Sequence, residues 1–435
     1  MISQFEWYRE CRFCIYTRLK ASVALRRVLL FFELKGGMDM LSLDKVFDAQ
    51  MVLKSIIRET RVVRAHGIAP HCELYLKPEN LQITGSFKVR GSAYKIAMLS
   101  EEEKAKGVIA CSAGNHAQGV ALAATKNGIK SLICLPDSAP ISKVEATKGY
   151  GAEVCLVEGC YDDAYQKALE LKEKEGYTFV HPFDDENVIA GQGTIALEIL
   201  NDLDNIDAIV VPIGGGGLIS GIAYTVKQIR PSVKVYGVQA AGAPSMFNSV
   251  KDGAIESLDS VSTIADGIAV KKPGENTYTL VRDYVDDIAL VSDDEVASAI
   301  LALMEKQKMI AEGAGAVSVA AVMFDKFDLK GKRVVAVVSG GNIDVTSLSR
   351  VVDRGLLNSG RSSSLLIELI DKPGQLKEIS RIIADCGGNV TGVHYEKGNT
   401  ESIKGCFLRI EMETRDFDHV NLITQSLREE GFKLV

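Results

Sequence analysis

The chain has 435 residues, too many for one ordinary hydrophobic core, so two or three domains are expected. Its composition, 46% hydrophobic and 25% charged residues, is that of a soluble globular protein. The net charge is −7 and no stripe of basic residues occurs, so we expect no nucleic-acid partner. The nine cysteines follow no regular framework and indicate reduced thiols in a cytoplasmic protein rather than a disulfide scaffold.

Residues 1–37 differ from the acidic remainder of the chain because they are rich in basic and aromatic side chains. Their apolar run, Val28–Phe32, is too short for a secretion-signal core of about 7–15 residues or a membrane span of about 20. We therefore expect a disordered extension or a non-native start, with Met38 or Met40 as the natural beginning, and no membrane partner.

Between residues 38 and 355, near-continuous apolar runs alternate with helical patterns such as Tyr161–Gly176 and Asp294–Lys308. Six runs read as buried parallel strands: 107–111, 131–135, 153–157, 208–213, 233–238 and 333–338. This alternation predicts a doubly wound α/β domain with helices on both faces of the sheet. The strands cluster before and after about residue 190, which indicates two lobes with a ligand cleft between them.

A polar linker is expected at 356–362, and the pattern changes beyond it. Over residues 363–435 the order is strand, helix, strand, strand, helix and short strand. This βαββαβ order predicts a separate, ferredoxin-like domain.

The first segment that could carry chemistry is Thr84–Gly91, which places Lys88 among small residues and beside Phe87. Most lysines are solvated surface residues, and for this segment alone that interpretation stays open. A lysine becomes a Schiff-base nucleophile when it is partly desolvated or lies beside another cation, because both conditions lower its pKa.

The second segment, Ser112–Gly119, directly follows the apolar run that ends at Cys111. A strand followed by small residues and a helix exposes backbone N–H groups at a helix start, which suits an anion. The alternative is a tight turn in which His116 is a satisfied buried histidine. The cluster of Ser, Asn, His and Gln in one turn favours the functional interpretation.

Two further segments also follow apolar strands, Gly214–Leu218 and Ser339–Asp344. Four consecutive glycines allow close backbone approach and a nest of N–H donors for a phosphate. They lack the GxGxxG spacing of a dinucleotide site and the Lys-Ser/Thr of a P-loop, so a nucleotide is not favoured.

A lysine, an anion-binding turn, a phosphate loop and a hydroxyl, mostly at strand ends, are what a pyridoxal-phosphate enzyme needs. Together the four motifs resemble the fold-type II pyridoxal-phosphate family, and specifically its threonine and serine dehydratases, over about Phe47–Asp353. The resemblance implies a two-lobed, tryptophan synthase beta-like catalytic domain, pyridoxal 5'-phosphate as cofactor and an amino acid as substrate.

The resemblance also assigns residues. It implies that Lys88 binds the cofactor as a Schiff base and later acts as the base at the substrate Cα. The implied cofactor-binding set is Phe87, Lys88, Asn115, Gly214, Gly215, Gly216, Gly217, Leu218 and Ser339. The implied substrate-binding set is Ser112, Ala113, Gly114, Asn115 and His116.

The residue at the implied pyridine-nitrogen position bears on the reaction. Ser339 is a neutral hydroxyl and cannot stabilise a protonated ring as an aspartate would, so β-elimination competes better with transamination. The implied reaction converts L-threonine to 2-oxobutanoate and ammonia by elimination of water, and L-serine to pyruvate as a side reaction.

Two departures separate the chain from other members of the wider family. Serine racemases carry a second serine, the base on the opposite face, where this sequence has Ala113. Gln239 and Ser245 stand where those relatives have carboxylates for a divalent cation, so no such metal is expected, while a monovalent cation stays open. The alternatives are a serine racemase, another β-elimination or β-replacement enzyme, and a non-catalytic amino-acid sensor.

The C-terminal unit contains Asp371–Gly374 between a strand and a helix, and Gly387–Asn389 before the next strand. Pro and Gly are also ordinary helix-start residues. Joined to the βαββαβ order, the motif resembles an ACT domain. The resemblance implies a small amino-acid effector near Gly374 and Asn389, and pairing of subunits into a homodimer or homotetramer. The identity of the effector and a biosynthetic or catabolic role stay open.

Overall fold

The computed structural model describes residues 41–396 and 405–435. The expected N-terminal extension, residues 1–37, lies outside the described residues. In the described part of the chain, no helix is both long and apolar enough to cross a membrane.

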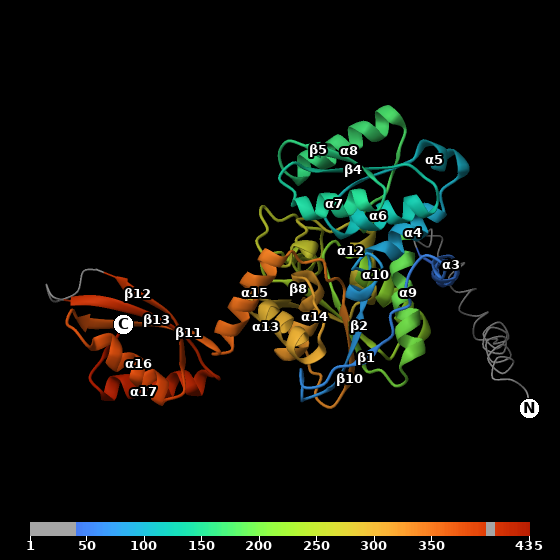
Figure 1. The fold of residues 1–435 in the computed structure, drawn as a ribbon. Coiled ribbons are helices and arrows are strands. Elements are labelled where there is room, and N and C mark those ends of the chain that lie inside the picture. The colour runs from blue at the N-terminus through green and yellow to red at the C-terminus, as the bar shows by residue number, and fades with distance from the viewer. Residues whose placement is uncertain (1–40, 397–404) are drawn as a thin grey trace, which may run out of the picture. The chain divides into compact units, whose positions relative to one another are not determined.

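A six-stranded sheet forms the larger lobe, in the order β1-β2-β10-β7-β8-β9 (Figure 1). Its strands are β1 Val63–Arg64, β2 Glu73–Pro78, β7 Ala208–Pro212, β8 Lys234–Ala240, β9 Asp287–Val291 and β10 Arg333–Val338. All neighbours are parallel except β1 and β2. The expected strands at 208–213, 233–238 and 333–338 are therefore confirmed.

A four-stranded parallel sheet forms the smaller lobe, in the order β5-β4-β3-β6. Its strands are β3 Val108–Cys111, β4 Ser131–Pro136, β5 Glu153–Val157 and β6 Thr178–Phe179. The division near residue 190 holds for these strands but not for β2, which precedes them in sequence and pairs with β10 in the large sheet.

Helices fill the intervals between the strands, as the alternating pattern predicts. They are α3 Leu43–Leu53, α4 Lys88–Ala97, α5 Glu101–Lys106, α6 Asn115–Lys126, α7 Ile141–Gly149, α8 Tyr161–Glu175, α9 Glu186–Asp202, α10 Gly217–Ile229, α11 Ser245–Asp252, α12 Glu275–Tyr284, α13 Asp293–Ala302, α14 Gly313–Met323 and α15 Val345–Asn358. Short helical turns are η1 Glu79–Leu81, η2 Asp266–Ile268 and η3 Leu303–Gln307.

The large sheet is buried on both faces because its strands are apolar at consecutive positions. In β7, Ala208 and Val210 belong to the core cluster that contains α13 and α14. The intervening Ile209 belongs to the cluster that contains α9 and α10. Side chains alternate across a strand, so a continuous apolar run serves both helical layers.

The C-terminal residues form the expected ferredoxin-like fold. Its elements are β11 Ser362–Ile370, α16 Gln375–Asp385, β12 Asn389–Glu396, β13 Gly405–Glu413, α17 Phe417–Glu429 and β14 Lys433–Leu434. The sheet is antiparallel, in the order β12-β13-β11-β14, and has its own core. The stretch at 356–362 is more regular than expected, because α15 continues to Asn358 and β11 begins at Ser362.

Candidate active site

The lysine motif lies against the Ser339 motif, although about 250 residues separate them in the sequence. Ser86 and Gly340 form an antiparallel bridge. Phe87 N donates to Ser339 O at 3.1 Å, and Gly341 N donates to Gly85 O at 2.9 Å. The start of α4 is thereby fixed at the carboxyl end of β10.

Lys88 is the first residue of α4 and is half-buried. Its Nζ donates to Pro182 O at 2.8 Å and lies 5.4 Å from the centroid of the Phe87 ring. Burial lowers the pKa of Lys88 from 10.5 to about 8, and the carboxylate of Glu312 opposes this shift. A substantial fraction of the amine is then neutral, and therefore nucleophilic, near physiological pH.

This pKa predicts the pH dependence of cofactor loading. Protein freed of pyridoxal phosphate should take it up at a rate that rises with pH and has its midpoint near 8, because only the neutral amine attacks an aldehyde. Stopped-flow absorbance from about pH 6 to 11.5 would measure this rate, with Nα-acetyl-lysine as the control for titration of the cofactor itself. A midpoint near 10.5, the ordinary lysine value, would contradict the prediction.

The tetraglycine loop connects β7 to α10 and has no room for a side chain. Gly216 has a φ of +98°, in the left-handed region that favours glycine. A Cβ on Gly215 would lie 2.4 Å from the ring of Phe183, and one on Gly217 would lie 2.8 Å from Phe183 O. The glycines therefore let Phe183 pack directly against the loop, and α10 starts with N–H groups that no helical carbonyl accepts.

The starts of α6 and α10, which follow the Ser112 turn and the tetraglycine loop, lack a side-chain cap. Their N-cap residues are Gly114 and Gly216, which have no side-chain acceptor. In contrast, α9, α13 and α15 begin with Asp185, Ser292 and Asp344, whose side chains accept from first-turn N–H groups. The uncapped N–H groups of α6 and α10 suit two anions, such as a phosphate and a carboxylate.

In the turn before α6, there is open space beside Gly114, whereas the first turn of the helix encloses His116 in the interior. A Cβ on Gly114 would meet nothing within 4 Å, and Ser112 Oγ accepts from Gly114 N at 3.2 Å. His116 is buried, with Nε2 bonded to Val180 O at 2.8 Å and Nδ1 facing Ser92 Oγ at 3.4 Å. Both ring nitrogens contact groups of the protein interior, and the expectation that His116 lines the substrate pocket stays a prediction.

Two residues outside the expected set complete the neighbourhood of Asn115. Asn115 Nδ2 donates to Glu312 Oε1 at 2.6 Å, and Asn115 Oδ1 accepts from Asn342 Nδ2 at 2.7 Å. Burial raises the pKa of Glu312 to about 7, and Asp266 adds to this shift, while Asn115 opposes it. The sequence holds one signal for Glu312, an acid directly before the apolar run of α14; Asn342 lies within a recognised motif but has no local mark.

The residues present fit pyridoxal phosphate. A partly neutral amine suits its aldehyde, and two uncapped helix starts suit its phosphate and the substrate carboxylate. Ser86 Oγ is buried without a hydrogen-bond partner, which leaves a polar group for a ligand. Ser339 is buried, and its Oγ donates to Ala314 O at 3.2 Å, so the pyridine nitrogen would have to compete with that carbonyl for the proton.

The positions considered for a divalent cation are used internally. Gln239 Oε1 accepts from Phe247 N at 2.7 Å, and Ser245 Oγ donates to Val270 O at 2.7 Å. Over residues 41–396 and 405–435, no three His, Cys, Asp or Glu side chains form a group suited to a metal ion.

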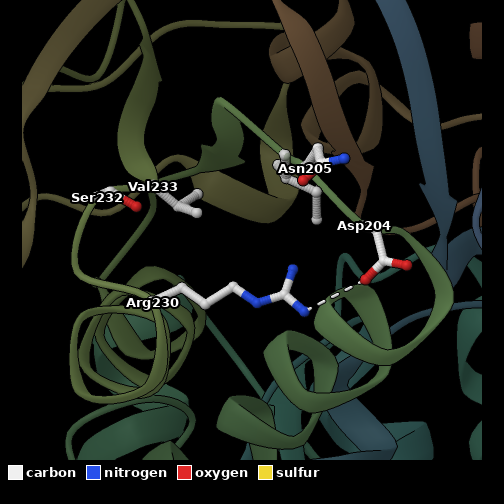
Figure 2. Close-up of a pocket in the computed structure, with 6 residues that line it drawn as sticks. Asp204, Asn205, Arg230, Ser232 and Val233 are labelled. Carbon is white, nitrogen blue, oxygen red and sulfur yellow. Dashed lines mark ion pairs between the residues drawn. The ribbon is translucent and has the colours of Figure 1, made fainter.

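A surface hollow lies at the amino ends of strands β7 and β8 of the large sheet (Figure 2). Its lining residues include Asp204, Ser232 and Val233, which precede the amino ends of β7 and β8. Arg230 there forms an ion pair with Asp204 at 3.6 Å and donates to Leu200 O at 3.2 Å. The four motifs gather at the carboxyl ends of the strands, so this hollow is not the candidate site.

The two residues expected to bind an effector do not meet within one chain. Gly374 precedes α16 and follows the end of β11, where Ile370 pairs with Gly405. Asn389 begins β12 and pairs with Glu413, at the opposite end of the sheet. One site cannot use both residues of the same chain.

Comparison with known proteins places these motifs in a family. A family model described as a pyridoxal-phosphate dependent enzyme matches residues 53–340. An L-threonine ammonia-lyase of Thermotoga maritima is 48% identical over 398 residues, which is 91% of this chain and 99% of that protein. The processed threonine deaminase isoform 2 of Solanum lycopersicum is similar in structure, with a TM-score of 0.69 and 38% identity, covering 73% of this chain and 90% of that one. Maize serine racemase has a TM-score of 0.69 and 35% identity, covering 73% and 98%.

Proposed function

The chain belongs to the pyridoxal-phosphate-dependent enzymes and, within them, to the threonine ammonia-lyases, and from that premise we propose the roles of its residues. The protein deaminates L-threonine to 2-oxobutanoate and ammonia, with pyridoxal phosphate as cofactor. The observation that carries the proposed roles is the half-buried Lys88, whose pKa is lowered to about 8, together with the uncapped starts of α6 and α10.

When bound, pyridoxal phosphate withdraws electrons from the substrate Cα and makes its proton acidic. Lys88 Nζ takes that proton, because a partly desolvated amine with a pKa near 8 is both neutral and basic enough at physiological pH. The N–H groups of the α10 start, Gly214 to Leu218, hold the phosphate. The start of α6, Ser112 to Asn115, would hold the substrate carboxylate.

The balance of atoms follows from the substrate. Threonine loses its Cα proton and its β-hydroxyl as water, which leaves an enamine. Water then adds to the enamine, and ammonia leaves, so the net products are 2-oxobutanoate and ammonia. Serine has the same leaving group without the methyl, and we infer pyruvate formation as a side reaction.

The function is tested by measuring 2-oxoacid and ammonia release from L-threonine and L-serine in equal amounts, with chiral analysis of the remaining serine. Oxoacid should exceed D-serine many times over. A protein that forms D-serine faster than pyruvate would be a racemase, and the proposed reaction would be wrong.

Ala113 gives a sharper prediction about the choice of reaction. The position is half-buried in the open turn before α6, and alanine has no proton to give there. Ala113→Ser would supply a hydroxyl on the face opposite to Lys88, so the ratio of D-serine to pyruvate should rise by at least about tenfold. Ala105→Ser, on the exposed side of α5 in the same lobe, is the control and should leave the ratio unchanged.

We further infer that the C-terminal domain is an ACT unit that regulates the enzyme, and that chains pair into a homodimer or homotetramer. The domain has its own core, and the candidate-site residues named above all precede it in the sequence. An effector acts only if it binds one state of the enzyme better than another, which typically corresponds to about 5- to 150-fold in affinity. A branched-chain amino acid such as isoleucine or valine is the proposed effector.

The regulatory proposal is tested with aspartate at two glycines in the left-handed region. Gly374 has a φ of +96° and Gly253 a φ of +76°, and a Cβ at either would meet nothing within 4 Å, so aspartate carries similar backbone strain at both. Gly374→Asp should blunt the response of the threonine saturation curve to isoleucine or valine, whereas Gly253→Asp, at the end of α11 in the catalytic domain, should retain it. If no amino acid at millimolar concentration changes the threonine saturation curve of the unsubstituted protein, the regulatory proposal fails and the domain is an assembly module.

A further inference from the structure

Asn115, Asn342 and Glu312 form a chain of side-chain hydrogen bonds whose direction is set at one end. We propose that Asn342 is a positioning residue that fixes the orientation of the Asn115 amide, with Nδ2 directed to Glu312 and Oδ1 directed to Asn342. The inference rests on the proposed function, since the amide so oriented is the one that meets the cofactor.

The direction follows from the Thr84 carbonyl, which can only accept a hydrogen bond. Asn342 Nδ2 lies 2.7 Å from Thr84 O and must therefore be the amide nitrogen. The same nitrogen lies 2.7 Å from Asn115, so the atom that Asn115 presents to it must be the acceptor, Oδ1. If the Asn342 amide were reversed, two oxygens would face each other at this distance.

The other end of the chain agrees with this direction. Once Oδ1 of Asn115 faces Asn342, its Nδ2 faces Glu312 Oε1, at 2.6 Å. A carboxylate oxygen is a strong acceptor for an amide N–H. Asn115 Nδ2 has a second N–H, which Glu312 does not take, and this remaining donor is available to an oxygen of a bound ligand.

Two glycines make room for this chain. A Cβ on Gly85 would lie 2.3 Å from Asn342 Oδ1, and one on Gly340 would lie 2.1 Å from Glu312 Oε1 and 3.2 Å from Asn115 Nδ2. The absence of a Cβ at these two glycines therefore leaves the space that the side chains of Asn342 and Glu312 occupy. The contact also joins α6 of the small lobe to the loop after β10 of the large one.

The test compares Asn342→Asp with Asn80→Asp in cofactor-free protein titrated with pyridoxal phosphate. A carboxylate at position 342 cannot donate to Thr84 O or to Asn115, so Asn115 would turn its Nδ2 toward that carboxylate. Asn80 is the matched control, since its Nδ2 also donates to a carbonyl, Ile310 O at 3.0 Å, beside Gly341, but does not contact Asn115. The readouts are the dissociation constant from fluorescence and the melting temperature of the cofactor-free protein.

We expect both substitutions to lower the melting temperature, but only Asn342→Asp to raise the dissociation constant by about tenfold, the loss of one well-made hydrogen bond. Equal effects of the two substitutions on the dissociation constant, or none from Asn342→Asp, would overturn the proposal. Either result would leave threonine deamination by the unsubstituted protein untouched.

A double variant separates orientation from mere loss of contacts. In Asn342→Asp with Glu312→Gln, the new amide at position 312 can donate to Asn115 Oδ1, while the new carboxylate at position 342 accepts from Asn115 Nδ2. The hydrogen bonds of Asn115 are then made in the reverse direction, while Thr84 O still faces a carboxylate oxygen. The melting temperature should therefore recover in part, to a value above that of Asn342→Asp alone, while the dissociation constant stays raised. Recovery of both would show that the direction of the amide does not matter.

Discussion

Lys88→Ala is expected to abolish nearly all threonine deamination and the visible absorbance of the protein loaded with pyridoxal phosphate. The substitution removes the amine that binds the cofactor and, at the same time, the base that takes the Cα proton. Loss of a positioned base alone costs about 10²–10⁴-fold in rate, and here the covalent attachment is lost as well.

Lys95→Ala is the matched control. Lys95 lies on the same helix, α4, and forms an ion pair with Asp185 at 2.7 Å, away from the motifs. It should keep both the absorbance and the rate close to those of the unsubstituted protein. Elimination at the normal rate by Lys88→Ala would show that another group carries the reaction.

Arg90→Met is expected to cause the largest loss of stability. Arg90 is completely buried, and its guanidinium donates to Glu79 at 2.8 Å and to Glu198 at 2.6 and 2.8 Å. Lys77 is the second buried cation and pairs with Glu198. Removal of Arg90 leaves two buried carboxylates with one lysine, which costs about 3–5 kcal/mol in the free energy of unfolding.

The loss of stability caused by Arg90→Met is expected to depend on pH. Burial by itself would raise the pKa of Glu79, but Arg90, with help from Lys77 and Thr60, holds that pKa below its ordinary value. In the unsubstituted protein, Glu79 therefore contributes stability above the unfolded-state pKa, and this contribution is lost as pH falls through the lower folded-state pKa. Without Arg90 the folded-state pKa rises, so the stability deficit of Arg90→Met should shrink as the pH is lowered from 7 to 5.

Urea unfolding at several pH values would measure the deficit. Arg354→Met is the control, because Arg354 also pairs with one carboxylate through two nitrogens, at 2.6 and 3.0 Å from Asp294, but is exposed. Solvent screens that pair, and little change is expected. A deficit for Arg90→Met no larger than that for Arg354→Met would mean that the buried network does not stabilise the fold.

The four motifs could be recognised from the sequence because each depends on residues that are close together along the chain. An apolar run followed by small residues and a helix start is a strand-to-helix turn wherever it occurs, and neighbouring residues alone determine it. Gly214 to Gly217 fall into this class, as does the turn before Asn115. The strand at 333–338 and the βαββαβ order of the C-terminal domain were predictable for the same reason.

The tertiary structure decided what each motif meets. Glu312 and Asn342 each lie more than 190 residues from Asn115 in the sequence but contact it in the fold. Pro182 contacts Lys88 although 94 positions separate them. No local sequence pattern predicts these contacts. The pKa of Lys88 depends on burial, which exists only once the chain is folded. Likewise, no local pattern of the sequence shows that the His116 ring contacts Val180 and Ser92.

The sequence by itself thus determined the class of chemistry, because the backbone conformations and residue types that hold a phosphate and supply an amine are properties of short segments. Only the fold decided which side chains are paired, which are buried and in which direction an amide points, since each of these depends on neighbours from distant segments. The same holds for the effector residues: Gly374 and Asn389 suit their loops locally, but the antiparallel register places them at opposite ends of one sheet.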